Sequence, residues 1–219
     1  MKKLFLVAIM AVFTSSAFAQ LMTGRSASLA KEESHNWGAF FVEYNPGSFS
    51  YSGDLKGVDD QTYNGVSLGV ASHISLGSIP LYFDYSFGMQ FTFATYENKY
   101  SSKYDIDYFL FSYKMPLGLS YMISIPNTPI DIIPNSGIDL RLNIVGTAKQ
   151  DGETSNLFSK DDMGGKDNTW NMFQAGMHVG CDVRFWKKLL LGFQYQFDFN
   201  EIATDSKCEQ VNLRLGVCF

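Results

Sequence analysis

Apolar residues alternate with polar or small residues through most of the chain after residue 36. The pattern is clearest over 81–93, where every second residue is large and apolar: Leu81, Phe83, Tyr85, Phe87, Met89, Phe91 and Phe93. A period of two belongs to a β-strand with one apolar face, whereas an amphipathic helix repeats every 3.6 residues. The chain is therefore predicted to be all-β.

The same alternation predicts eight strands, at 36–45, 66–71, 81–93, 109–123, 138–144, 173–185, 189–199 and 210–219. Their connections alternate in length. Those at 74–80, 124–131 and 186–188 are short, and those at 46–62, 95–104, 147–168 and 201–207 are mostly longer and more polar. Long loops gathered at one end are typical of an antiparallel, up-and-down transmembrane β-barrel. An even strand number brings both termini to the short-turn end, which is predicted to be periplasmic.

The apolar face is predicted to point outward, into lipid. An eight-stranded barrel has an interior just wide enough for side chains. Phe, Tyr, Leu and Met dominate the apolar face, whereas Gly, Ser, Asn, Gln and a few charges occupy the other. A strand of 13 residues tilted by about 45° rises roughly 30 Å, which matches a hydrocarbon core. The alternative is a secreted β-sandwich that buries the apolar face.

The start of the chain has the pattern of an export signal. Lys2 and Lys3 precede an apolar run, Leu4–Phe13, and Ala17-Phe18-Ala19 forms a small-x-small cleavage site. The run is too short for a membrane-spanning helix, which needs about 20 residues. We predict a cleaved signal peptide at 1–19, a flexible polar lead-in at 20–35, and the barrel at 36–219.

Charged residues of both signs occupy the inward face. The predicted lumen network contains Asp84, Lys114, Asp139, Arg141, His178, Asp182, Arg184 and Arg214, together with Glu43 and Asp198. Buried charges persist only when they are paired and hydrogen-bonded. The network is therefore predicted to fill the lumen as a salt-bridged plug, with Arg141 beside Asp139. A catalytic role for the same carboxylates is the alternative.

The end of the chain, Leu213-Arg214-Leu215-Gly216-Val217-Cys218-Phe219, resembles the closing strand of small outer-membrane β-barrel proteins of the OmpX and OmpA-barrel type. The segment Lys114–Tyr121 is similar to a Pro-containing strand of the PorT-like branch from Bacteroidetes-type bacteria. The resemblance implies a place in the cell outer membrane, with outer-membrane lipid as a partner. It also implies that the barrel-assembly machinery reads a C-terminal insertion signal, formed by Leu213, Leu215, Val217 and Phe219.

Pro116 interrupts the predicted fourth strand. A proline inside a strand removes one hydrogen bond of the ladder, and a closed barrel has no free edge to place it on. We therefore predict a β-bulge beside Gly118.

Candidate enzyme and metal sites are sparse. The only nearby His–Ser pair is His73 with Ser75, predicted at a periplasmic turn, while His178 points into the lumen and His35 lies in the lead-in. The acidic residues around Asp161 and Asp162 lack the spacing of a calcium loop. Cys181, Cys208 and Cys218 form no CxxC pair, so three free thiols are predicted. We expect no enzyme activity, no metal and no cofactor.

The predicted function is that of a non-enzymatic outer-membrane barrel. Its long loops would provide any recognition of a protein or glycan ligand. A formal net charge of −5 with interspersed signs argues against nucleic-acid binding. Two alternatives remain: a component of an outer-membrane secretion or assembly machinery, and a lipid-modifying enzyme.

Overall fold

The computed structural model describes residues 36–51, 61–77, 79–96, 105–163, 165 and 169–219. The predicted signal peptide (1–19) and lead-in (20–35) lie outside these residues. The described elements are β1 (Trp37–Tyr44), β2 (Gly47–Tyr51), β3 (Gln61–Ser75), β4 (Leu81–Tyr96), β5 (Ile106–Tyr121), β6 (Ile123–Ser124), β7 (Ile130–Gln150), β8 (Glu153–Asn156), β9 (Phe173–Phe185), β10 (Leu189–Asp198) and β11 (Ser206–Cys218). Within the described ranges, no helix is long and apolar enough to cross a membrane.

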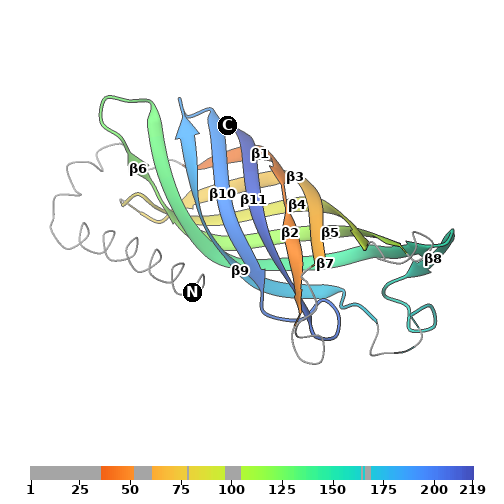
Figure 1. Ribbon diagram of the computed structural model, residues 1–219. Helices are drawn as coiled ribbons and strands as arrows, with labels where there is room; N and C mark the ends of the chain where they lie inside the picture. The colour runs from red at the N-terminus through yellow and green to blue at the C-terminus, as the bar shows by residue number, and fades with distance from the viewer. Residues whose placement is uncertain (1–35, 52–60, 78, 97–104, 164, 166–168) are drawn as a thin grey trace.

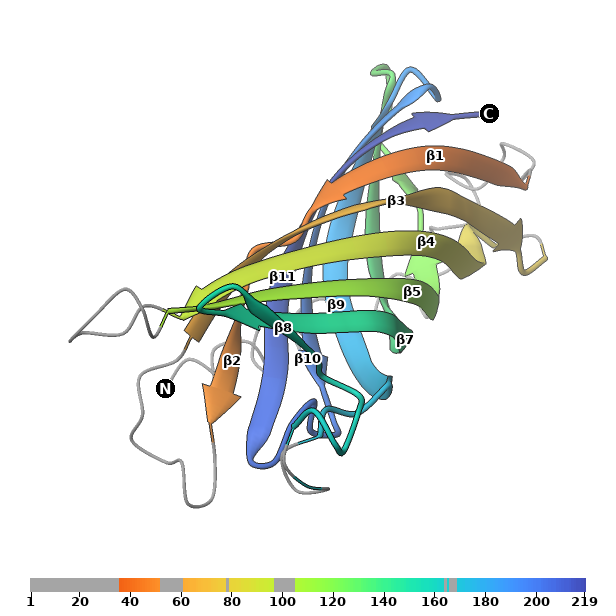
Figure 2. The same ribbon diagram turned by 90° about the vertical axis from the view of Figure 1, so that its right-hand side faces the viewer.

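The antiparallel sheet closes on itself. β1 pairs with β11 on one side and with β3 on the other, and β10, β9, β7, β5 and β4 complete the ring (Figures 1 and 2). β2 continues β1 between the same two neighbours, and β6 continues β5 beside β7. The ring therefore has eight strand positions, which confirms the predicted eight-stranded antiparallel barrel.

The start of β1 and the end of β11 lie side by side at the short-turn end. The Gly38 amide donates to the Phe219 carbonyl at 3.0 Å, and the Phe219 amide donates to the Gly38 carbonyl at 2.8 Å. The C-terminus accordingly lies beside the start of β1 (Figure 1).

Several strands are longer than the sequence pattern predicted. The strand predicted at 66–71 extends over all of β3, and the strand predicted at 138–144 extends over the 21 residues of β7. β2 and β8 fall in segments that were predicted to be loops, 46–62 and 147–168. Beyond the apolar belt, outward-facing residues such as Thr62 and Lys149 are polar. The alternation therefore stops there, while the hydrogen-bond ladder continues.

The predicted bulge beside Gly118 is wrong. Gly118 pairs with Asp84 on β4 and with Gly137 on β7 without a shift in register. The shift lies higher on β5, where Phe111 pairs with Val145 but Ser112 pairs with Asn143. Ile144 of β7 is therefore the extra residue. A bulge turns two consecutive side chains to one face, and Ile144 and Val145 are both exposed.

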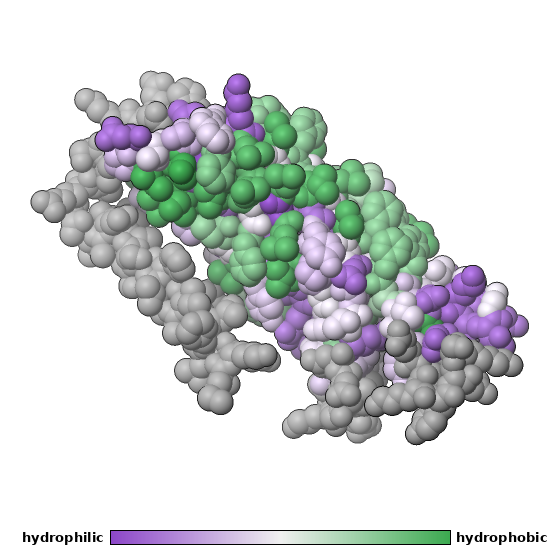
Figure 3. Space-filling view, turned by 45° about the horizontal axis from the view of Figure 1, so that its top comes forward, coloured by the Kyte–Doolittle hydropathy of each residue, from purple (hydrophilic) through white to green (hydrophobic). Residues whose placement is uncertain are grey.

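The inward and outward faces follow the predicted alternation. Leu142 is 42% exposed, and its neighbour Asn143 is 1% exposed. Apolar side chains cover the barrel wall, and polar residues gather toward the two ends (Figure 3). The large apolar side chains that remain exposed include Phe40, Leu68, Phe87, Phe93, Ile138, Phe193 and Leu215.

Candidate functional site

The interior of the barrel has three layers. At the long-loop end lies an apolar group that we call the mouth cluster: Phe49, Tyr63, Ala94, Leu110, Ile202 and Cys208. At the short-turn end lies a second group, the base cluster: Ala39, Tyr82, Met122, Ile133 and Leu190. Charged and amide side chains fill the space between them.

The two apolar clusters were not predicted. Tyr82 and Leu190 occupy inward positions that were expected to be polar or small, whereas Phe49 and Ile202 lie in segments that were predicted to be loops. The signal was present in consecutive apolar residues near strand ends, such as Leu189–Leu191 and Phe109–Phe111. A strand that is apolar on both faces there is buried on both faces, by lipid outside and by the cluster inside.

Loop residues contribute to the closure of the mouth. Trp170 packs against the mouth cluster, with its ring centroid 5.6 Å from that of Phe49 and 5.5 Å from that of Tyr108. The Trp170 amide donates to the Leu157 carbonyl at 2.9 Å, and the Leu157 side chain is fully buried. Phe158 and Trp170, which belong to the connection between β8 and β9, thus pack against the apolar group at the barrel opening.

Glu43 lies in the charged layer and forms ion pairs with two basic residues. Its Oε1 accepts hydrogen bonds from Arg214 Nε at 2.9 Å and Nη2 at 2.7 Å, and its Oε2 accepts from Lys114 Nζ at 3.2 Å. Arg214 Nη1 also lies 3.7 Å from Asp182 Oδ2, and its guanidinium lies 4.6 Å from the centre of the Phe41 ring. The three charged groups around Glu43 therefore come from β5, β9 and β11, on different sides of the lumen.

Arg141 of β7 forms its ion pair with a residue of β10, two strands away in the ring. Its Nη2 contacts Asp198 of β10, and its Nε donates to Gln174 Oε1 of β9 at 2.8 Å. The partner expected from the sequence, Asp139, instead lies 2.9 Å from His178 Nδ1. Asp139 and Arg141 extend from the same strand, but Asp139 pairs with a residue on the neighbouring β9, whereas Arg141 reaches past β9 to β10.

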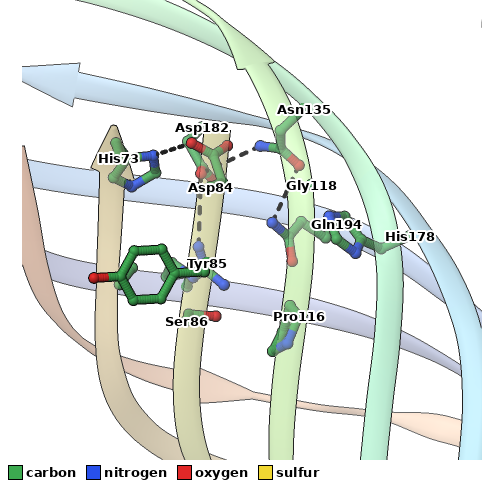
Figure 4. Close-up of a pocket in the computed structure, with 12 residues that line it drawn as sticks. His73, Asp84, Tyr85, Ser86, Pro116, Gly118, Asn135, His178, Asp182 and Gln194 are labelled. Atoms are coloured by element: carbon green, nitrogen blue, oxygen red, sulfur yellow. Dashed lines mark hydrogen bonds and ion pairs between the residues drawn. The ribbon is translucent and has the colours of Figure 1, made fainter. Parts of the chain in front are cut away.

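A further pair of contacts lies at the short-turn end of the lumen. Arg184 donates from Nε and Nη2 to Asp131 Oδ2, at 3.0 and 2.8 Å, and its guanidinium lies 4.6 Å from the Trp37 ring centre. Trp37 stacks on His73, with centroids 3.6 Å apart. His73 Nδ1 lies 2.6 Å from Asp84 Oδ1 (Figure 4).

Two members of this group were missed because their strands were predicted too short. Asp131 was assigned to the turn at 124–131, and His73 was placed with Ser75 at a periplasmic turn. Both lie inside the barrel and are buried. With them, the Lys and Arg side chains and the two histidines of the central layer each contact a carboxylate.

Amide side chains connect the charged pairs. Gln210 Nε2 donates to Gln196 Oε1 at 2.9 Å and to Asn212 Oδ1 at 2.8 Å, while Gln90 Nε2 donates to Gln210 Oε1 at 3.1 Å. Asn45 Nδ2 donates to Asn212 Oδ1 at 2.7 Å. These residues were predicted only as a class, as the polar lining of the lumen.

Two small cavities lie within the described part of the layer. One of about 20 Å³ is lined by His73, Asp84, His178, Asp182 and Arg214, among others (Figure 4). Another, of about 10 Å³, lies between Arg141 and the mouth cluster. A water molecule needs roughly 10–15 Å³ of such space. Each cavity therefore accommodates a water molecule and nothing much larger.

Thiol groups and acidic residues form no further site in the described ranges. Cys181, Cys208 and Cys218 are free, as predicted. No group of three or more His, Cys, Asp or Glu residues in these ranges is arranged to hold a metal ion.

The residues of the predicted insertion signal lie on the outer surface of the closing strand. Leu213, Leu215 and Val217 are exposed and pair with Tyr44, Val42 and Phe40 of β1. The Phe219 ring lies 4.9 Å from that of Phe40. It covers Gly38, where a Cβ atom would lie 2.8 Å from the ring. The seam between first and last strands is therefore covered by apolar side chains on its lipid-facing side.

Comparison with known proteins finds similar structures. The chain matches no protein-family model and no curated protein. It is similar to the attachment invasion locus protein Ail of Yersinia pestis, at 12% identity and a TM-score of 0.44, over 84% of this chain and 99% of Ail. It is similar to Neisserial surface protein A, at 17% identity and a TM-score of 0.44, over 82% and 97% of the two chains. It is also similar to the outer-membrane enzyme PagL, at 11% identity and a TM-score of 0.44, over 81% and 98%.

Proposed function

We propose that the chain is an integral outer-membrane protein whose barrel is a closed, non-enzymatic scaffold for the long-loop end. The filled lumen is the observation that carries this proposal. Two apolar clusters close the ends of the interior, and paired charges fill the middle. A solute would have to displace buried ion pairs, and a buried charge that loses its partner costs about 3–5 kcal/mol.

The location follows from the outer surface. Exposed Phe, Leu, Ile and Val side chains cover the wall, and lipid is the solvent in which such a surface is stable. The closed ring satisfies its backbone groups internally, as a strand-built membrane protein requires. Outer-membrane lipid is therefore the first partner, and the barrel-assembly machinery is a partner during insertion.

The environment of the histidines supports a non-enzymatic role. His73 and His178 are buried, and each ring contacts an aspartate. The Ser75 hydroxyl, two residues along the strand from His73, donates to the Gly77 carbonyl at 3.1 Å. Neither histidine is placed as a base toward an exposed nucleophile.

The β7–β8 hairpin is the part of the long-loop end best suited to recognition. Beyond the bulge, β7 pairs with β5 on one side and with β8 on the other, so a small sheet extends past the ring (Figure 1). Its tip carries exposed polar and charged residues, including Lys149, Asp151 and Glu153. A protein or glycan ligand would be bound there by hydrogen bonds and charge.

Conductance tests the closed lumen. The purified barrel in a planar bilayer is expected to pass no steady, porin-like current. A stable large conductance would contradict the scaffold proposal, because it requires a continuous aqueous path between the two clusters.

A pull-down tests the hairpin. Thr147 and Asn156 face each other across β7 and β8, so residues 148–155 can be replaced by Asn-Gly with the loss of only the last two β5–β7 pairs, at Ala148 and Lys149. Intact protein should capture a partner from an outer-membrane detergent extract, and the shortened variant should not. Equal capture by both would refute a recognition role for the hairpin. Capture of secretion-machinery proteins would favour the alternative function.

A further inference from the structure

One turn of the barrel departs from the residue types that its backbone favours. A positive φ angle between about 50° and 145° occurs at eight described residues: Gly77, Asn127, Asp151, Gly152, Gly165, Trp186, Lys187 and Asp205. Six of the eight are Gly, Asn or Asp, which tolerate this conformation. Trp186 and Lys187 are the exceptions, and they are adjacent.

The two residues form the centre of the β9–β10 turn. The Lys188 amide donates to the Phe185 carbonyl at 2.9 Å, and φ is 50° at Trp186 and 57° at Lys187. Positive φ at both central residues is the pattern of a type I′ turn, which strongly favours Asn-Gly. A bulky side chain in this region is strained. The fold of the turn therefore gives no reason for tryptophan and lysine.

The side chains of the turn are exposed on the surface of the barrel. Trp186 is 64% exposed, and Lys187 and Lys188 are also exposed. The backbone is fixed from both sides, because the Trp186 amide donates to the Pro129 carbonyl and the Cys218 amide donates to the Lys188 carbonyl, both at 2.7 Å. The turn thus presents an indole ring and two ammonium groups on a rigid support.

The two lysines lie at the opposite end of the barrel from the other exposed charged side chains that the structure describes. Among the described residues, the other exposed charged side chains lie at the long-loop end: Asp107, Lys149, Asp151, Glu153, Lys160, Asp161 and Asp162. Arg184 and Asp131, near the β9–β10 turn, are buried and paired with each other. The exposed side-chain charge at the short-turn end, over the described ranges, is therefore positive.

We propose that Trp186, Lys187 and Lys188 bind the phosphate headgroup of an anionic phospholipid in the leaflet around the short-turn end. The inference rests on the proposed membrane-spanning function. Indole rings prefer the boundary between hydrocarbon and headgroups. Lysines near an anionic membrane surface are each attracted by roughly a fivefold factor in the binding constant. Contact with the headgroup would offset the strain of the turn.

The test compares lipids that differ only in headgroup charge. The full chain is folded into vesicles of phosphatidylcholine alone or mixed with phosphatidylglycerol, and its denaturant unfolding is measured. Phosphatidylglycerol should raise the folding equilibrium constant of the unmodified protein by roughly 25-fold, from two lysines at about fivefold each. Lys187→Gln with Lys188→Gln should remove this gain and leave stability in phosphatidylcholine unchanged. The matched control, Lys149→Gln with Lys160→Gln, should keep the gain.

A second variant separates lipid binding from turn geometry. Trp186→Asn with Lys187→Gly should fold more stably than the unmodified protein in phosphatidylcholine, because the strain is removed. It should show a smaller response to phosphatidylglycerol. An equal response in all variants would overturn the inference, as would the same gain from inorganic phosphate added to phosphatidylcholine vesicles. Failure of the unmodified chain to fold into any vesicle would instead refute the membrane-spanning function itself.

Discussion

Replacing Glu43 by glutamine is expected to destabilise the barrel by about 3 kcal/mol. The carboxylate is 2% exposed and accepts hydrogen bonds from Arg214 and Lys114. Breaking a buried ion pair by removing one partner costs about 3–5 kcal/mol. The lower value applies here because the amide oxygen can still accept from Arg214, which also lies 3.7 Å from Asp182. Lys114 would keep only a long contact with Asn212 Oδ1, at 3.5 Å.

A second substitution tests this explanation. If the cost comes from the stranded Lys114 ammonium, Lys114→Met added to Glu43→Gln should recover about 1–2 kcal/mol. The assay is urea unfolding in vesicles, followed by the heat-modifiable gel mobility of the folded barrel. Glu153→Gln, an exposed acid on β8, is the control and should change stability by less than about 0.5 kcal/mol. A loss below about 1 kcal/mol for Glu43→Gln, or no recovery in the double variant, would refute the reasoning.

Two further predictions concern the outer surface. Phe87→Arg, an exposed position midway along the β4 wall, should cost about 2–4 kcal/mol in urea unfolding, whereas the inward-facing Ser86→Ala should be milder; the reverse order would mean that the faces are inverted. Deletion of Phe219 should leave export intact but lower the membrane-inserted fraction measured by cell fractionation, because the ring loses its contact across the β1–β11 seam; an unchanged fraction would argue against an insertion signal there.

The alternation of side chains made the fold predictable. Each strand that crosses the apolar belt needs large apolar residues on one face, and β9 was predicted at its observed bounds, Phe173–Phe185. Outside the belt neither face is consistently apolar, so β2, β8 and the last residues of β7, 147–150, were predicted as loops. The bulge on β7 was also missed, since Ile144 and Val145 read as an ordinary apolar pair.

The ion-pair partners of the charged residues were less predictable than the face of the strand on which each residue lies. Alternation is enough to show that Asp139 and Arg141 face inward, because facing depends only on strand parity. Their partners depend on register, strand tilt and side-chain reach, none of which one strand encodes. Arg141 therefore pairs with Asp198, 57 residues away in the chain. The base and mouth clusters were missed for another reason: an inward apolar residue near a strand end looks the same as an outward one next to it.

The pairing of Glu43 with Arg214 has a consequence for how the barrel forms and opens. The two residues are 171 positions apart and face each other across the β1–β11 seam. Arg214 therefore lacks this partner until the last strand reaches the first. Contacts between residues so distant in sequence form late and slowly. A partly assembled sheet can form the ion pairs between neighbouring strands, such as Arg184 with Asp131, but it lacks the Glu43–Arg214 pair. This pair at the centre of the lumen should consequently form only when the ring closes, and it should break when the seam parts.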